Sequence, residues 1–219
     1  MTMPANDIRD PVQERAQITR EKLLDAAIRC FARTGYDASS TRHIESAAGV
    51  KRGLIGYHFG TKEALWKAAA SWMFERAAAE LQVTERSAAN IDPVARLRYF
   101  VRAFVQFNAR FPEVNQLMVR EGMDDDWRLQ WLVENTVRPW YERVRELFEG
   151  ARAQGLGPAI AYPHFYYILT GAAALMFSMA PEAKQLASID TRDESIVNAH
   201  ADALADLLFP QTQPDQERA

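Results

Sequence analysis

Ten basic side chains lie between Arg15 and Lys67, and this cluster is the first feature of the sequence that can do chemistry. Arginine and lysine bind phosphate oxygens, and arginine can also pair with guanine through two hydrogen bonds. The same segment holds five acidic residues, so its net charge is +5, and the rest of the −3 chain carries −8. A basic head on an acidic body favours a nucleic-acid partner; the alternative is a solvated face that happens to be basic.

Other kinds of chemistry find little support in the sequence. The four histidines show no metal-ligand spacing, and no nucleophile elbow, Walker loop or dinucleotide-binding glycine turn is present. We therefore expect no catalytic residue, cofactor or metal, and no enzyme. The run Asp124-Asp125-Asp126 could be a metal patch, but a helix N-cap with first-turn acids is favoured because no histidine is near. Cys30, the single cysteine, excludes an internal disulfide.

Composition describes an ordinary globular chain. The 219 residues are 48% hydrophobic and 25% charged, which suits one large domain or two small ones. The N-terminus MTMPANDIRD is polar and has no apolar signal region, so we expect a cytoplasmic protein. The uncharged run FYYILTGAAALMFSMA is shorter than the roughly 20 residues that a membrane span needs, so no membrane partner is expected.

Apolar spacing predicts the elements that position the basic residues. A helix is expected from Thr19, its N-cap, to Gly35. After a turn, Ser40 or Thr41 can cap the short helix RHIESAA, and a second short helix is expected from Lys51 to His58. Two short helices joined by a glycine turn form the helix-turn-helix layout.

The segment from Leu23 to Leu65 resembles the N-terminal domain of the TetR family of transcriptional regulators. Its sequence is LLDAAIRCFARTGYDASSTRHIESAAGVKRGLIGYHFGTKEAL, and the match is ordered and free of gaps over about a fifth of the chain. The resemblance implies that the second short helix reads the major groove of an operator. The residues expected to contact DNA are Thr41, Arg42, Lys51, Arg52, Gly53, Leu54, Gly56, Tyr57, His58 and Lys62.

These residues have different expected roles. Arg52 is the best candidate for a base contact, and Arg42 can reach either a phosphate or a guanine edge. Backbone clamps are expected at Lys51, Tyr57, His58 and Lys62. Two residues depart from the family pattern. The family commonly has Thr or Ser at the position of Leu54, and Tyr at the position of Gly56. Leu54 can instead touch a thymine methyl group, and Gly56 can let the helix approach the DNA backbone closely.

The acidic remainder is expected to be helical as well. Asp92 and Pro93 begin one helix, Phe111-Pro112 breaks it, and a long helix from about Trp127 to Ala153 is expected to kink at Pro139. In the family the equivalent helices surround an inducer pocket. Candidate ligand-binding residues are Phe104, Met118, Trp127 and Trp131, and the alternative is that each is simply part of the core.

The last two helices are candidates for a homodimer interface. The apolar helix at 165–180 must be buried on more than one side, and the amphipathic helix at 194–209 can pair with it around a twofold axis, as the resemblance also implies. A purely intramolecular core is the alternative. The sequence thus predicts an all-α protein: an N-terminal three-helix helix-turn-helix domain and a larger antiparallel helical domain for ligand binding and dimerisation. The expected boundaries are a flexible arm at 1–14, a DNA-binding domain at 15–62, a regulatory domain at 63–209 and a disordered tail at 210–219.

These expectations combine into a ligand-responsive repressor that binds a double-stranded, palindromic operator as a homodimer. A small-molecule effector in the acidic body would shift the population of head spacings. The sequence does not identify the effector, nor whether it releases or promotes DNA binding. Two other functions stay open: a regulator that acts as an activator, and a helical interaction protein with weakened DNA binding.

Overall fold

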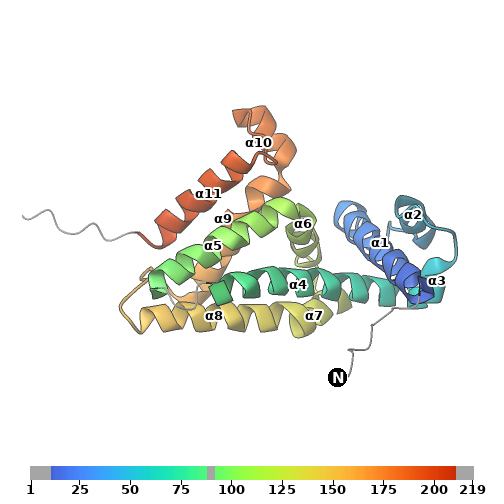
Figure 1. Ribbon diagram of the computed structural model, residues 1–219, viewed down its shortest axis with the longest axis horizontal. Helices are drawn as coiled ribbons and strands as arrows, with labels where there is room; N and C mark the ends of the chain where they lie inside the picture. The colour runs from blue at the N-terminus through green and yellow to red at the C-terminus, as the bar shows by residue number, and fades with distance from the viewer. Residues whose placement is uncertain (1–10, 88–91, 211–219) are drawn as a thin grey trace, which may run out of the picture. The chain divides into compact units, whose positions relative to one another are not determined.

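The computed structural model describes residues 11–87 and 92–210, and throughout these ranges the regular elements are helices (Figure 1). The chain divides into two compact units, Met1–Trp72 and Met73–Ala219. None of the described helices is long and apolar enough to cross a membrane. The expected all-α fold is confirmed.

The N-terminal unit holds three helices and the start of a fourth. They are α1 (Pro11–Thr34), α2 (Thr41–Ala47), α3 (Leu54–Phe59) and α4 (Lys62–Ser87), which continues into the second unit. Helix α1 begins eight residues before the predicted start, so residues 11–14 are its first turn rather than part of an arm. Thr19 is therefore not an N-cap; its Oγ1 donates to the Arg15 carbonyl at 2.9 Å inside the helix. Residues 1–10 of the predicted arm lie outside the described residues.

The core of this unit is built from the apolar faces that the periodicity predicted. Leu23, Phe31, Ile44, Ile55 and Trp66 are all buried, and they come from every helix of the unit. Cys30 is buried with them, and this burial raises the pKa of its thiol. Because only the thiolate is reactive, Cys30 serves as a small core residue.

The second unit contains the remaining helices. They are α5 (Pro93–Arg110), α6 (Pro112–Glu121), α7 (Trp127–Leu132), the π-helical turn η1 (Val133–Val137), α8 (Arg138–Arg152), α9 (Tyr162–Ser178), α10 (Ala180–Ala187) and α11 (Glu194–Leu208). The predicted caps are confirmed, since Asp92 accepts from the Ala95 N–H and Asp126 from the Arg128 N–H. Residues 211–219 of the predicted tail lie outside the described residues.

A π-helical turn precedes Pro139, the residue at which the sequence predicts a kink. Proline has no N–H to donate to the preceding turn, and η1 ends two residues before it. Side chains supply donors there: Thr136 Oγ1 donates to the Leu132 carbonyl at 2.7 Å, and Asn135 Nδ2 to the Trp131 carbonyl at 2.8 Å. The helix thus continues from α7 into α8 without a break.

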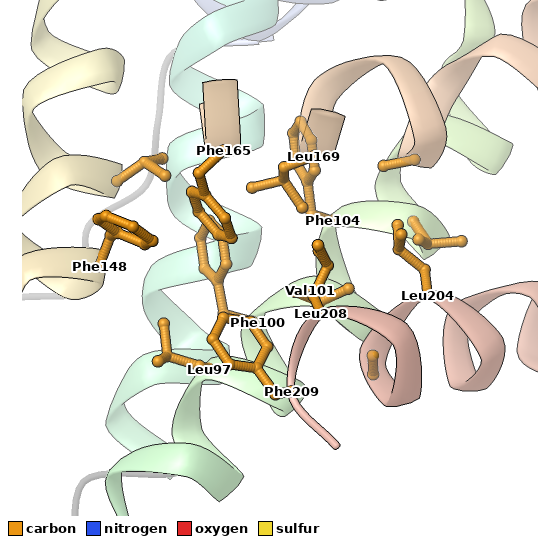
Figure 2. Close-up of a cluster of buried hydrophobic side chains, with 14 of the residues drawn as sticks. Leu97, Phe100, Val101, Phe104, Phe148, Phe165, Leu169, Leu204, Leu208 and Phe209 are labelled. Carbon is orange, nitrogen blue, oxygen red and sulfur yellow. The ribbon is translucent and has the colours of Figure 1, made fainter. Parts of the chain in front are cut away.

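Aromatic and aliphatic side chains from α5, α8, α9 and α11 form the core of this unit (Figure 2). Phe148 on α8 stacks on Phe165 of α9 with ring centroids 4.5 Å apart. The predicted ligand-binding residue Phe104 belongs to this core, where its ring lies 5.5 Å from that of Trp140. Helix α9 buries one face here, whereas Tyr167 and Leu175 on its other face are exposed.

Candidate nucleic-acid interface

Local hydrogen bonds define the helix-turn-helix geometry. The Ser40 hydroxyl caps α2 by accepting from the His43 N–H at 3.1 Å, as predicted for this residue. After α2 the chain turns through Gly49, which has a φ of +66° that a side chain would disfavour. The Val50 N–H then donates to the Glu45 carbonyl at 3.1 Å. The chain reverses within a few residues and leads into α3.

Glu45 joins α2 to α3 and was missed by the sequence reasoning. Its side chain is 5% exposed, and its carboxylate accepts from the Ile55 backbone N–H at 2.9 Å. The N-cap of α3 is Gly53, which has no side chain to satisfy the free N–H groups of the first turn. Glu45 therefore acts as the cap, and its negative charge suits the positive end of the helix. The sequence signal that could have revealed this cap is an acidic residue among the apolar residues that join the two short helices.

The predicted DNA-contact residues fall into two groups by exposure. Six of them are exposed, and Tyr57 has an exposed fraction of 79%. The exposed residues are Arg42, Lys51, Arg52, Gly53, Gly56 and Tyr57. The partly buried residues are Thr41, Leu54, His58 and Lys62. The exposed group offers two arginines, one lysine and one phenol to a partner.

Lys51 and Arg52 do not lie on α3. The expected helix began at Lys51, but α3 begins at Leu54, and Gly53 before it has a φ of +88°. Lys51 and Arg52 therefore lie in the turn, where their side chains extend from the N-terminal end of α3. Backbone N–H groups and positive side chains at a helix N-terminus suit phosphate contacts.

Lys62 makes contacts within its own unit. Its ammonium donates to the carbonyls of Tyr36 at 2.9 Å and Ser39 at 3.2 Å, and it lies 4.2 Å from the centre of the Tyr36 ring. These contacts tie the first turn of α4 to the loop between α1 and α2. The primary role of Lys62 in this structure is to hold the loop, since two of its three donors are used there.

Gly56 lies on the exposed surface of α3 with open space around it. A Cβ atom built there meets nothing within 4 Å. Its backbone is ordinary helix, so the fold does not require a glycine at this position. The absence of a side chain leaves the backbone of α3 accessible, as expected if the helix approaches its partner closely.

Two cavities of about 750 Å³ and about 400 Å³ lie in the second unit, and neither is lined by Phe104, Met118, Trp127 or Trp131. Trp127 is partly exposed, whereas Phe104 is packed in the core. Among the described residues no group of three or more His, Cys, Asp or Glu side chains could hold a metal ion.

These features define a helix-turn-helix protein with a separate helical C-terminal unit. Residues 23–69 match the family model described as "Bacterial regulatory proteins, tetR family". The chain is 48% identical over 60 residues to the HTH-type transcriptional repressor Rv1474c of Mycobacterium tuberculosis, a match covering 27% of this chain and 32% of that protein. The N-terminal part of the chain is therefore similar to the DNA-binding domain of TetR-family regulators.

Solved structures extend the likeness to the whole fold. A Clostridium perfringens putative fatty acid metabolism regulator has a TM-score of 0.67 at 18% identity, covering 84% of this chain and 95% of that one. HlyIIR, a hemolysin II transcriptional regulator, has a TM-score of 0.62 at 22% identity, covering 87% and 99%. At such identities only the fold is shared. The match to the Mycobacterium repressor spans about a third of that protein's length.

Proposed function

We propose that this protein is a sequence-specific DNA-binding transcriptional regulator, most simply a repressor that acts in the cytoplasm. The observation that carries the proposal is the exposure of Arg42, Lys51, Arg52 and Tyr57 around α3 of a TetR-type helix-turn-helix unit. Arginine and lysine neutralise phosphates, and arginine can read guanine in the major groove. Relatives that match this unit are named as repressors and regulators, which supports the same role here.

The test is selection of a duplex from a randomised DNA library, followed by anisotropy titrations on the selected duplex and on a random duplex. We expect tighter binding to the selected duplex and affinity that falls steeply with salt, because phosphate contacts release counterions. Equal affinity for both duplexes, or no dependence on salt, would refute sequence-specific DNA binding and favour a helical interaction protein.

Single substitutions separate base contacts from phosphate contacts. Arg52→Ala is expected to weaken the selected duplex by about tenfold or more and the random duplex less, if Arg52 reads a base. Lys51→Ala is expected to weaken both duplexes alike. Arg145→Ala in the C-terminal unit removes the same charge from an exposed side chain and serves as the control. Equal losses on both duplexes for Arg52→Ala would exclude the base contact.

We further propose that the protein acts as a homodimer through the helices at 165–180 and 194–209, so that two copies of α3 read a palindromic operator. The support is an exposed apolar stripe along α9 and the residue after it. Tyr167, Gly171, Leu175 and Met179 follow one another at steps of four residues, and Leu207 on α11 is exposed as well. Side chains of this kind remain in water in a single chain, and a twofold copy would cover them.

Sedimentation at micromolar concentration tests the dimer. The wild-type chain is expected to sediment as a dimer, and Leu175→Glu as a monomer because it places charge in the proposed interface. Val119→Glu, at an exposed apolar residue of α6, is the matched control and is expected to leave the dimer intact. A wild-type monomer at this concentration would refute the dimer.

We also propose that a small molecule bound in the C-terminal unit modulates operator binding. In the proposed dimer, such a ligand changes the spacing of the two DNA-binding units only if it binds one spacing more tightly than another. Phe104, Met118, Trp127 and Trp131 stay a prediction for its binding. The sharpest check is a thermal-shift screen against apolar metabolites, followed by operator titrations with each ligand that raises Tm.

A further inference from the structure

A ladder of polar contacts joins α5 to α11, which run side by side in opposite directions (Figure 1). Each step moves four residues forward on α5 and four residues back on α11, which is the spacing that keeps side chains on one helix face. The three rungs are Arg98 with Asp206, Arg102 with Asp202, and Gln106 with Asn198, the last at 3.1 Å. The same step predicts a fourth rung between Arg110 and Glu194.

The fourth rung is not formed. Arg110 Nη1 lies 3.1 Å from Glu80 Oε2 on α4 instead. Glu194 takes part in no ion pair between described residues. Where the rung would lie there is a cavity of about 750 Å³, and both Arg110 and Glu194 line it. The cavity therefore lies at the end of this series of contacts, with the positive Arg110 of α5 and the negative Glu194 of α11 in its lining.

The rest of the cavity lining adds charges of both signs. Arg192 and Glu113 line it, and no ion pair within the described part of the chain uses either of them. Thr191 also lines it; the residue is only 8% exposed, and its hydroxyl makes none of the hydrogen bonds found among the described residues. Thr191 therefore adds to the lining a hydroxyl group that no described residue uses. Ala109 and Val197 contribute an apolar wall.

We propose that this cavity binds a small zwitterionic molecule with the charges of an amino acid. Its carboxylate would pair with the guanidinium of Arg110 or Arg192, and its ammonium with the carboxylate of Glu113 or Glu194. A cavity of this volume suits a small organic ligand. A molecule with a single charge would pair either with the arginines or with the glutamates, and would leave the groups of the other sign without a partner. This site is separate from the DNA-binding unit, and its occupancy can be measured without DNA.

Four six-carbon compounds test the charge requirement on the full-length chain by isothermal titration calorimetry. Two are zwitterions with different charge separations, L-2-aminohexanoate and 6-aminohexanoate; two carry one charge, hexanoate and hexylamine. We expect at least one zwitterion to bind saturably and at least tenfold more tightly than both singly charged compounds, since each charged hydrogen bond that is lost costs about that factor. Failure of both zwitterions to bind, or equal binding by hexanoate or hexylamine, would overturn the proposal.

Substitutions locate the binding site. Glu194→Gln and Arg192→Gln remove the charges of exposed side chains and leave polar amides in their place. Each is expected to lower the affinity for the bound zwitterion about tenfold. Glu146→Gln and Arg145→Gln remove the same charges from exposed positions on α8 that do not line the cavity. These controls are expected to bind as the wild type does. Wild-type affinity in these two variants and also in Glu113→Gln and Arg110→Gln would exclude this cavity as the site.

Discussion

Gly56 is the residue at which stability and DNA binding are expected to oppose each other. It is exposed within α3, and a Cβ atom there meets nothing within 4 Å. Glycine costs a helix about 1 kcal/mol relative to alanine, so Gly56→Ala is expected to raise Tm by several degrees. If α3 approaches DNA closely at this position, the added methyl group lowers DNA affinity. Calorimetry and anisotropy titrations on the same preparation measure both effects.

The control for this substitution is Gly150→Ala in α8. Gly150 is also exposed in a helix, and its Cβ would meet nothing within 4 Å. It is expected to raise stability in the same way and leave DNA affinity unchanged. Unchanged DNA affinity in Gly56→Ala would show that the helix does not approach DNA at this residue.

At the scale of elements, the joint between α2 and α3 depends on a buried carboxylate. Glu45→Ala leaves the buried Ile55 N–H without its acceptor, and is expected to lower the free energy of unfolding by about 1–3 kcal/mol. Because α3 as a whole loses its anchor, affinity should fall alike on the selected and random duplexes. Glu45→Gln keeps an acceptor and should lose less. Chemical denaturation and anisotropy titrations measure the two effects.

Glu63→Ala on α4 is the matched control for the α2–α3 joint. Glu63 pairs with Lys67 at the surface, where an ion pair contributes less than about 1 kcal/mol. If Glu45→Ala were no less stable than Glu63→Ala, Glu45 would not serve as the cap of α3.

The tyrosine cluster between α8 and α9 makes the second unit sensitive to alkaline pH. Burial, followed by the neighbouring Tyr167 and Tyr141, raises the pKa of Tyr166 from 10.0 to about 12. The folded state holds this proton more tightly than the unfolded state, so its contribution is complete below pH 10 and is lost as the pH rises towards about 12. Urea unfolding at pH 8, 10 and 11.5 should show this loss.

Tyr166→Phe removes this ionisable group and is expected to lose less stability over the same pH range. Part of the loss should remain, because burial also raises the pKa of Tyr162. Tyr99→Phe, at an exposed position on α5, should follow the wild-type curve. Identical curves for all three proteins would contradict a role of Tyr166 in alkaline stability.

The elements themselves were largely predictable because their signals are local. Ser40, Asp92 and Asp126 act as caps through N–H groups two or three residues away, so each can be found within one short segment. The predicted start of α1 was wrong. A threonine hydroxyl can hydrogen-bond to a backbone carbonyl inside a helix as well as cap its N-terminus, and Thr19 does the former. The cavity between Arg110 and Glu194 was not predictable, since it depends on the register between α5 and α11. The contacts of Lys62 with the Tyr36 and Ser39 carbonyls were not predictable, because a sequence does not show which carbonyls face an ammonium group.

At the scale of the whole molecule, charge is distributed unevenly along the chain. The segment from Arg15 to Lys67 carries +5 and the rest of the chain −8. DNA repels the acidic residues and attracts the basic ones, so the acidic part should weaken binding at random sequences. This effect acts over a distance and is screened within about 10 Å at 0.1 M salt. The acidic charge outside this segment is therefore expected to lower non-specific affinity for DNA.

Neutralising four exposed acids on η1 and α8 tests this argument. Replacement of Glu134, Glu142, Glu146 and Glu149 by Gln changes the formal charge of −3 to +1. The variant is expected to bind a random duplex several-fold more tightly at 50 mM salt, and the difference should vanish above about 0.3 M. A control with Glu142, Arg143, Arg145 and Glu146 all replaced by Gln keeps the net charge and should bind as the wild type does. If both variants bind the random duplex equally, net charge does not set non-specific affinity, and selectivity must come from the contacts around α3 alone.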